Sequence, residues 1–524
     1  DGTWYAHASV GLLHVRPVLN LRQDLGVAKM RAIAEEAFDL VAAYKGSHSG
    51  EHGDGIVRSE FHERMFGSRM VRSFEQVKDR FDPDAILNPG KIVRAPKMDE
   101  RSLLRWPVDY RQENPETVFD WSQWPGGLIG ATEMCNNNGA CRKAVGGVMC
   151  PSYRVTRNER DVTRGRANSL RLALTGRLGK KALFSPEMAD TMHLCVSCKA
   201  CKSECPMSVD MAKMKIEIQH ARIARQGLSL RDRVIANLPR YAPLAARIPF
   251  LSNLPRAFPK LLEQGLGLSA KRKTPKFVKP FNQTGSGEVL IFADTFNRHF
   301  EPETLYATMR VIERCGYSVG VVQSPNGNIC CGRTFLSAGL TEQAKSRMST
   351  AADAFGEALN AGKIIVGLEP SCVLTFRDEA VNLLSDWTEE MGQRILTFGE
   401  FMRTVQPGNL HSIGDKALVH GHCHQKAFGC ADATMETLGF IPGLVPDMIE
   451  SSCCGMAGQF GYQKETEDVS QQMAELSLAP TIRKAAEDTL LVADGFSCRC
   501  QIKETTNRNA MHSAVALDRA MSKS

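Results

Sequence analysis

The sequence lacks a long hydrophobic segment: its 524 residues contain no stretch of about 18 uncharged apolar residues. A membrane-spanning helix is therefore not expected. The chain also opens without a basic segment followed by an apolar one, so no secretory signal peptide is visible. Its net charge of +7 is small for this length and is spread along the chain, which gives no case for nucleic-acid binding.

Cysteine, by contrast, is abundant. The chain has 17 cysteines, and most of them form clusters at 135–150, 195–205, 330–331, 423–454 and 498–500. This spacing is unlike that of a secreted disulfide framework. Clustered cysteines in a chain without a secretory signal indicate metal ligands in a reducing compartment. We therefore expect a cytoplasmic metalloprotein.

The chain is long enough for several domains, since one domain takes roughly 150 residues. Its 43% apolar and 23% charged residues are ordinary for a globular protein. Apolar residues recur at helical spacing from Leu25 to Tyr44, with Gly46 as the expected stop, and a second helix follows a Gly-rich loop. Residues 3–19 read as a hairpin, so the chain is expected to be a fragment that lacks a part before Asp1.

The strongest motif is a cysteine-rich loop, Cys195-x2-Cys198-x2-Cys201-x3-Cys205-Pro206. Three thiolates in so compact a loop can wrap one face of a [4Fe–4S] cube, while the fourth cysteine, before proline, reaches a neighbouring cluster. A structural zinc site is the alternative, since thiolates also bind zinc. The spacing with its proline is far more typical of an iron–sulfur cluster.

An upstream cysteine motif is degenerate. Asn138 stands between Cys135 and Cys141 where a middle cysteine is expected, and Cys150-Pro151 follows after eight residues. Crossed ligation predicts one complete [4Fe–4S] cluster and a second site with three thiolates, which would hold a three-iron cluster, recruit a non-cysteine ligand or hold nothing. The ligands of the first cluster would be Cys150, Cys195, Cys198 and Cys201, and those of the second site Cys135, Cys141 and Cys205.

An internal repeat occupies the C-terminal part of the chain. The Cys-Cys-Gly segment at 330–332 recurs at 453–455, and each copy lies between two strand-like runs, the later of which ends in Cys372 or Cys498. Strands that alternate with helices predict two small α/β units.

The second repeat is the better candidate for a further cluster or metal, with small buried cysteines beside a tight turn as the alternative in both repeats. The first repeat keeps only Cys330, Cys331 and Cys372. Cys315 and Cys430 are isolated and are expected in the core. The candidate ligands of the second repeat are Cys423, Cys453, Cys454, Cys498 and Cys500, with His420, His422 and His424 nearby.

Proline, arginine and lysine are frequent between the cysteine-rich loop and the repeat, at 228–286. This composition favours a solvated linker. A basic surface helix that touches a membrane or a partner is the alternative.

Two histidines and a glutamate form a candidate metal site near the start of the chain. His7 and His14 are symmetric about a Val10-Gly11 turn, so in a two-residue hairpin they would face each other with Cβ atoms about 5 Å apart. Glu51 could add an oxygen ligand and leave one position open for substrate. The adjacent His52 has the intrinsic pKa of a base near neutral pH. A structural role for the histidine pair is the alternative.

Several motifs in the same order resemble a known enzyme family. The segments YAHASVGLLHVRP, SGEHGDG and FDPDAILNPGKI look like the C-terminal half of flavin-linked D-2-hydroxyacid dehydrogenases of the vanillyl-alcohol oxidase type. MCPSYRVTRNERDVTRGRAN, the cysteine-rich loop and the two Cys-Cys-Gly units resemble the fused bacterial FAD/iron–sulfur dehydrogenases of this type. The Cys-Cys-Gly units are also similar to those of glycolate oxidase iron–sulfur subunits and heterodisulfide reductases.

The resemblance implies roles for individual residues. His7, His14 and Glu51 would bind a divalent metal, expected to be zinc, which grips the 2-hydroxycarboxylate. His52 would take the hydroxyl proton while hydride passes to FAD, beside which Asn88 would lie. The part of the family that holds most of the FAD lies before the first residue of this chain.

The expected function is oxidation of a D-2-hydroxyacid, with D-2-hydroxyglutarate preferred over D-lactate. Electrons would pass through the clusters to a quinone, a cytochrome or a flavoprotein, with peripheral contact at the inner face of the membrane and a homo-oligomer as further expectations. Arg16 and Arg58 could bind a distal substrate carboxylate, and a surface role is the alternative for each. The rival hypothesis is a non-catalytic iron–sulfur subunit that serves a separate flavoprotein.

The predicted fold is therefore α+β and multidomain. Its parts are a C-terminal portion of an FAD-linked oxidase domain, a connector, a helical ferredoxin-like [4Fe–4S] module, a linker and a duplicated α/β unit. Their expected ranges are 1–98, 99–130, 131–227, 228–286, 287–405 and 406–524.

Overall fold

A computed structural model describes residues 2–108, 110–111, 115–179, 181–325, 329–405 and 407–521. The chain divides into two compact units, Asp1–Arg111 and Gln112–Ser524, and each is described by itself. Among the described residues, no helix is both long enough and apolar enough to cross a bilayer.

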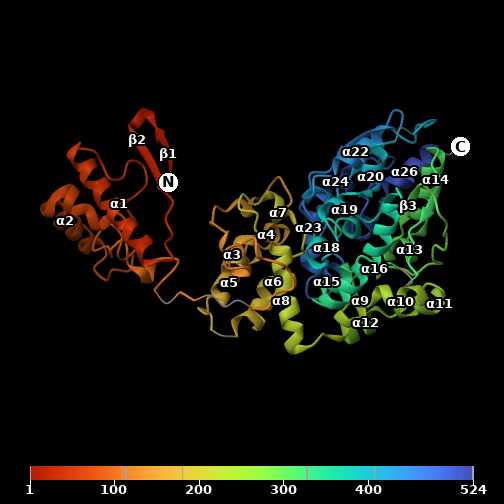
Figure 1. Ribbon diagram of the computed structural model, residues 1–524, viewed down its shortest axis with the longest axis horizontal. Coiled ribbons are helices and arrows are strands. Elements are labelled where there is room, and N and C mark those ends of the chain that lie inside the picture. The colour runs from red at the N-terminus through yellow and green to blue at the C-terminus, as the bar shows by residue number, and fades with distance from the viewer. Residues whose placement is uncertain are drawn as a thin grey trace. The chain divides into compact units, whose positions relative to one another are not determined.

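The N-terminal unit opens with an antiparallel hairpin of β1 (Gly2–His7) and β2 (Leu12–Pro17) (Figure 1). The expected two-residue turn is wrong: a 3-10 turn over Ala8–Val10 and a left-handed Gly11 join the strands. The register therefore pairs His7 with Leu12, and His14 with Tyr5.

Two long helices complete this unit, α1 (Asp24–Ala43) and α2 (His62–Phe81). The first helix follows the predicted span, but Lys45 rather than Gly46 takes the left-handed conformation that ends it. A Gly-rich loop, residues 46–58, connects the helices and carries the expected catalytic motif.

The second unit begins with a helical module, whose helices lie together in Figure 1 and which contains the cysteine-rich loop. Ile129, Leu170 and Met214 form part of its core and are fully buried. The helices are α3 (Leu128–Glu133), α4 (Pro151–Thr156), α5 (Thr163–Leu174), α6 (Pro186–His193), α7 (Ala200–Glu204) and α8 (Met211–Gln226).

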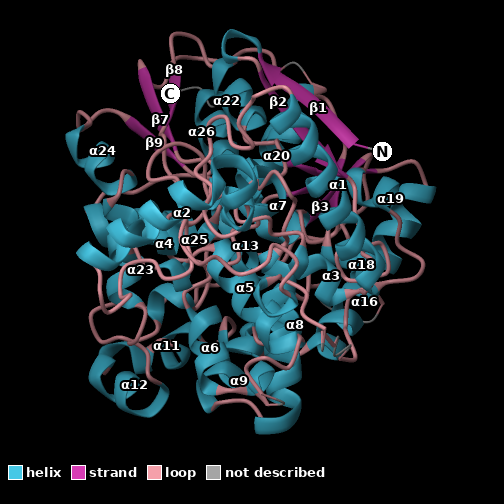
Figure 2. Ribbon diagram, turned by 90° about the vertical axis from the view of Figure 1, so that its left-hand side faces the viewer, coloured by secondary structure: helices cyan, strands magenta, loops and turns pink. Residues whose placement is uncertain are grey.

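Two parallel sheets follow, and their matching topology confirms the predicted duplication into α/β units. The first has the order β4-β3-β5-β6 and the second β8-β7-β9, so the first strand of each unit lies between the next two. The strands of the second sheet lie together in Figure 2. The strands are β3 (Val289–Phe292), β4 (Val319–Val321), β5 (Ile364–Gly367), β6 (Ile395–Thr397), β7 (Lys416–Val419), β8 (Val445–Met448) and β9 (Leu490–Val492).

One hydrophobic core joins the two sheets, because Val366, Phe398, Val419 and Leu517 belong to a single buried cluster. The helices of the first α/β unit are α13 (Thr295–His299), α14 (Pro302–Arg314), α15 (Arg333–Ser337), α16 (Thr341–Asn360), α17 (Pro370–Val373), α18 (Glu379–Leu383), α19 (Glu389–Gln393) and α20 (Phe398–Arg403). Those of the second are α21 (Cys423–Ala427), α22 (Asp432–Gly439), α23 (Glu467–Glu475), α24 (Leu478–Lys484), α25 (Phe496–Thr506) and α26 (Ser513–Met521).

The segment expected to be a solvated linker is helical. Ala236, Ala242 and Phe281 are fully buried, because short turns separated by prolines lay one side of the segment against the α/β units. Its helices are α9 (Leu230–Ala236), α10 (Leu238–Ala245), α11 (Pro249–Ser252) and α12 (Pro259–Leu266).

Candidate functional site

The hairpin and the Gly-rich loop bring the expected metal ligands of the N-terminal unit together. His7 and His14 are diagonal neighbours on one face of the hairpin, since His7 pairs with Leu12 and His14 lies two residues further along the same strand. Their ring centroids are 4.9 Å apart. The assumed register was wrong, but diagonal neighbours are close enough for long side chains to meet.

Glu51 lies between the two imidazoles. Its Oε1 is 2.9 Å from His14 Nε2, and its Oε2 is 3.4 Å from His7 Nε2. The loop can approach the hairpin because residue 50 is glycine: a Cβ there would lie 2.2 Å from Leu12 Cδ1.

This donor set fits a divalent ion. One ligand atom from each of His7, His14 and Glu51 lies within 4.8 Å of the others. Among the described residues, buried His14 Nε2 has no partner with the geometry of a hydrogen bond, although Glu51 is close. Tyr5 stacks on the His14 ring with a centroid distance of 4.3 Å, which holds the imidazole plane. Two imidazole nitrogens and a carboxylate are a ligand set of catalytic zinc.

His52 and Arg16 flank this site. His52 Nε2 lies 3.4 Å from Glu51 Oε1, and its side chain is 69% exposed, so it is accessible to a substrate. The Arg16 guanidinium donates to the Tyr5 hydroxyl at 2.5 Å, which places its charge on the ring that supports His14.

Asn88 lies in the exposed turn before Gly90, with a positive φ of 47°. The turn is held by Asp82, whose carboxylate accepts from the backbone N–H groups of Ile86 and Leu87. The hydrogen bond from Lys78 lowers the pKa of Asp82, which keeps this carboxylate charged. A fixed turn can present the Asn88 amide outward.

The cysteine-rich loop of the second unit forms a thiol pocket with the upstream motif. Cys195, Cys198 and Cys201 line one pocket together with Cys150, the four residues expected to bind the first cluster. Positive φ angles at Ser197 and Lys199 curl the loop, so that the three cysteines face the same space. Four thiols around one cavity fit a [4Fe–4S] cluster.

Positive charge surrounds these thiols. Burial raises the pKa of Cys198 and of Cys201 well above that of a free thiol, so bound metal or nearby cations must stabilise the thiolates. Arg166 is 1% exposed and lines the same pocket, and the Lys215 ammonium donates to the Cys195 carbonyl. Such cations offset the negative charge of a thiolate-ligated cluster.

The degenerate motif lies next to this pocket. The pKa of Cys141 is raised to about 11, mainly by burial and to a smaller extent by the neighbouring Cys150 and Cys135 thiols. Asn138, at the position of the missing cysteine, is exposed and accepts from the Ala140 N–H at 2.8 Å. The Asn138 side chain therefore completes a local turn.

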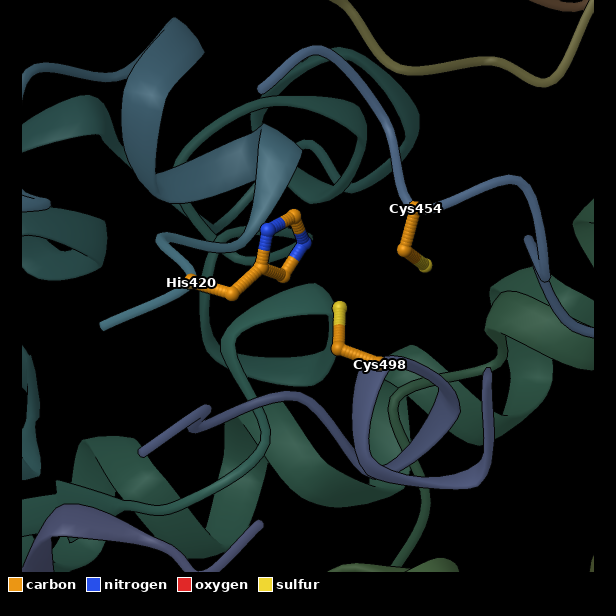
Figure 3. A group of neighbouring side chains, drawn as sticks. All are labelled: His420, Cys454 and Cys498. Atoms are coloured by element: carbon orange, nitrogen blue, oxygen red, sulfur yellow. The ribbon is translucent and has the colours of Figure 1, made fainter. Parts of the chain in front are cut away.

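A second thiol-rich group follows β7, in the second α/β unit. His420, Cys454 and Cys498 point toward one another from the end of β7, the Cys-Cys-Gly turn and α25 (Figure 3), with ligand atoms within 4.8 Å. A hydrogen bond from the Cys453 thiol lowers the pKa of Cys423 to about 7. Cys423, Cys453, Cys454 and Cys498 thus form a connected set of thiols.

Cys500 is outside this set. It lies beside Tyr462, and burial raises its pKa to about 12. In an α-helix, positions two apart point in different directions, so Cys498 and Cys500 cannot face the same site.

The first α/β unit holds a similar group with fewer thiols. Cys331 Sγ lies 3.0 Å from Cys372 Sγ, and Cys330 is hydrogen-bonded to Thr295. Thr295 is the first residue of α13, as Cys423 is of α21, so threonine stands where the second unit has its additional thiol. Aligning the segment after the first strand of each repeat could have revealed this substitution from the sequence.

The cysteine-rich loop packs against the second thiol group. The pKa of Cys198 is raised mainly by burial. The next largest cause is the nearby Cys423 thiol, so the two cysteines lie close together. His424 Nε2 donates to the Ser197 carbonyl at 3.0 Å. The sequence indicated His424 only as a neighbour of possible ligands, and nothing in its spacing pointed to this contact.

A buried charge network joins the same loop to the first α/β unit. Lys199 is 1% exposed, and its ammonium lies 2.6 Å from both Asp378 and Glu379. Arg333, directly after the first Cys-Cys-Gly segment, donates to Glu379 at 2.7 Å. The thiol sites of the helical module and of the two α/β units are therefore connected through the contacts of His424 and Lys199.

Three segments match known domain families. Residues 1–92 match the family "FAD linked oxidases, C-terminal domain". Residues 131–209 match "4Fe-4S dicluster domain" and residues 293–377 match "Cysteine-rich domain". These matches agree with the resemblance inferred from the motifs, and they support FAD and iron–sulfur cofactors.

Two longer relatives match nearly the whole of this chain. The sequence is 28% identical to "D-2-hydroxyglutarate dehydrogenase" of Escherichia coli (strain K12), over 98% of this chain and 55% of the relative. It is 27% identical to the protein of the same name from Pseudomonas putida, over 97% and 54%. The chain thus spans about half the length of these relatives.

Another relative matches half of this chain. It is one of the subunits of the anaerobic glycerol-3-phosphate dehydrogenase of Escherichia coli (strain K12), and it is 25% identical over 50% of this chain and 69% of its own length.

Proposed function

We propose that this chain belongs to an FAD- and iron–sulfur-dependent dehydrogenase that oxidises a D-2-hydroxyacid, with D-2-hydroxyglutarate as the preferred substrate. The observation that carries the proposal is the convergence of His7, His14 and Glu51 beside His52 in the N-terminal unit. The names of the longer relatives support the substrate class.

The site has a group for each role in such an oxidation. A divalent ion held by His7, His14 and Glu51 would supply Lewis acidity toward the substrate hydroxyl and carboxylate. His52 accepts the hydroxyl proton at Nε2, which faces Glu51, and its exposure lets a substrate reach it. FAD would supply an acceptor for the hydride that can also release electrons one at a time. Asn88 would offer its amide to the flavin from the exposed turn before Gly90.

The thiol sites form the outward path for electrons. The pocket of Cys150, Cys195, Cys198 and Cys201 would hold a [4Fe–4S] cluster, and the second α/β unit would hold a further cluster or metal. Contact between the cysteine-rich loop and α21 places these two sites next to each other. The acceptor is a quinone, a cytochrome or a flavoprotein.

The rival function is an electron-transfer subunit without catalytic activity. The match to the shorter relative covers half of this chain. A subunit that only relays electrons needs no proton acceptor and no metal site for a hydroxyacid. The N-terminal unit has candidates for both, because His7, His14 and Glu51 lie beside His52.

Substitution of the base tests the proposal. In the FAD-containing enzyme, His52→Ala should reduce kcat for D-2-hydroxyglutarate by about 100-fold or more, because general-base catalysis contributes this much. Iron and sulfide contents should stay unchanged, and His411→Ala, on an exposed residue of the second unit, serves as the control. Unchanged turnover in His52→Ala would contradict the proposal, and a higher kcat/KM for D-lactate would correct the substrate.

We further propose that helices α10–α12 bind an anionic membrane surface. Phe250 is 91% exposed, and Leu244, Leu254 and Leu261 are each more than half exposed. These helices lie along one edge of the second unit (Figure 1). Exposed apolar side chains among basic ones are typical of interfacial helices. The basic side chains of this surface are Arg240, Arg247, Arg256 and Lys260.

Vesicle sedimentation tests this surface. The protein should sediment with vesicles that contain phosphatidylglycerol and less with pure phosphatidylcholine vesicles, because basic residues favour anionic lipid. Phe250→Ser with Leu251→Ser should weaken sedimentation, and Val145→Ser, at another exposed apolar position, should not. Equal sedimentation of both variants would refute the assignment.

A further inference from the structure

The N-terminal unit contains a second group of metal-binding side chains, formed by His48, Asp54 and His62. His62 Nε2 lies 2.9 Å from Asp54 Oδ2, and His48 Nε2 lies 3.4 Å from Asp54 Oδ1. One ligand atom from each residue lies within 4.8 Å of the others. None of these residues belongs to the site of His7, His14 and Glu51.

The hydrogen bond of His62 Nδ1 leaves a lone pair on His62 Nε2 facing the Asp54 carboxylate, and a cation or a proton must lie between them. His62 Nδ1 lies 3.0 Å from the Ile92 carbonyl oxygen, and a carbonyl can only accept, so Nδ1 carries a hydrogen. In neutral imidazole, Nε2 then presents a lone pair, and it faces a carboxylate oxygen. This contact is stable only with a proton between the two atoms, carried by His62 or by Asp54, or with a metal ion there.

The other two residues favour the metal ion. The His48 side chain is 1% exposed, and within the described part of the chain His48 Nε2 and Asp54 Oδ1 are buried without a hydrogen bond. A second proton on His62 would satisfy Asp54 Oδ2 and leave His48 Nε2 and Asp54 Oδ1 unpaired, which is costly for buried polar atoms. An ion bound among the three residues would give His48 Nε2, the Asp54 carboxylate and His62 Nε2 a common partner.

The surroundings resemble those of a bound transition metal. The contact between His62 and the Ile92 carbonyl is the hydrogen bond that metal-binding histidines usually make with their second nitrogen. Phe38 contacts the His48 ring edge-on at 5.3 Å, and Phe66 contacts the His62 ring at 5.5 Å. Apolar rings keep water out of the site and strengthen the charge interactions within it.

We propose that His48, Asp54 and His62 bind a second divalent transition-metal ion, of which zinc is the type best suited to two imidazoles and a carboxylate. His48 precedes Glu51 in the Gly-rich loop, Asp54 follows it, and His62 begins α2. The ion fastens both arms of the loop to α2 and so positions Glu51 and His52.

Zinc content tests the site. The cluster-replete chain is dialysed anaerobically against zinc, and zinc and iron are measured separately. The wild type should retain about two zinc ions per chain in addition to the clusters. Asp54→Asn and His48→Gln, each close to the original side chain in size, should retain about one, and His411→Gln should match the wild type.

A further variant separates this site from the first one. His14→Ala removes a ligand of the catalytic site, and it should leave one zinc ion that is lost when Asp54→Asn is added. Wild-type zinc content in both Asp54→Asn and His48→Gln, with iron unchanged, would overturn the proposal and assign His62 to a protonated ion pair. A failure of His14→Ala to lose zinc would count against the catalytic site alone.

Discussion

His424 Nε2 donates a hydrogen bond of 3.0 Å to the carbonyl oxygen of Ser197, within the cysteine-rich loop. The two residues are far apart in sequence and belong to different cysteine motifs. Burial lowers the pKa of His424 well below its usual value, so the imidazole is neutral and donates from a single nitrogen. This contact fastens the loop with Cys198 to the helix that begins at Cys423.

The contact predicts the behaviour of His424→Phe. Phenylalanine fills a similar volume but leaves the Ser197 carbonyl without its donor, which costs about 1–3 kcal/mol. Backbone amides of residues 195–205 should then exchange hydrogen faster than in the wild type. Exchange should stay unchanged in the sheet of β3–β6. Equal protection of the loop in both proteins would contradict a fastening role.

The thiol pocket predicts different results for two cysteines of one motif. Cys198→Ser should lower the iron content by about four atoms per chain and reduce the visible iron–sulfur absorbance by the share of that cluster, because the thiol lines the pocket. Cys205→Ser should retain the first cluster, since Cys205 is expected at the degenerate site. The isolated Cys430 provides the control, as Cys430→Ser. Full absorbance in Cys198→Ser would contradict the ligand assignment.

The buried charge network predicts that Lys199 matters more than Lys202. Both ammonium groups contact Asp378, but the Lys199 side chain is 1% exposed and that of Lys202 is 44% exposed. Lys199→Met leaves buried carboxylates short of a cation and should destabilise the second unit by about 3–5 kcal/mol. Lys202→Met should cost less than about 1 kcal/mol. Chemical denaturation of the two variants measures the difference, and equal costs would contradict the network.

His299 predicts a pH dependence of stability. Burial lowers its pKa from 6.5 to about 4, so the folded state holds the neutral imidazole while the unfolded chain binds a proton below pH 6.5. Titration of His299 therefore leaves the free energy of unfolding unchanged above pH 6.5. Between pH 6.5 and 4 it lowers this free energy, by roughly 2 kcal/mol at pH 5. His299→Gln does not titrate here, so its Tm should fall less than that of the wild type from pH 7 to 5. Parallel decreases would contradict this role of His299.

The chemistry of this protein could be inferred from local sequence, because ligand type and short spacing are properties of one segment. The loop from Cys195 to Cys205 indicates an iron–sulfur cluster without any knowledge of its neighbours. The two Cys-Cys-Gly segments with their strands predicted the duplicated α/β units, which the matching sheets confirm. The helix over Asp24–Ala43 follows from apolar spacing.

Other features depend on contacts between segments that are distant in sequence. The register of the hairpin depends on its turn, so His7 and His14 meet as diagonal neighbours rather than as a direct pair. The helices at 230–266 gain their stability from packing, which composition does not report.

The sequence by itself determined which residue types can bind metals and clusters, since thiols, imidazoles and carboxylates have that chemistry wherever they lie. Only the tertiary structure decided which of them meet. It showed that Thr295 in the first repeat is equivalent to Cys423 in the second. It also joined His424 to Ser197 and brought His48, Asp54 and His62 together. The physical reason is that a ligand set is defined by distances of a few ångströms, and these are set by packing across the whole fold.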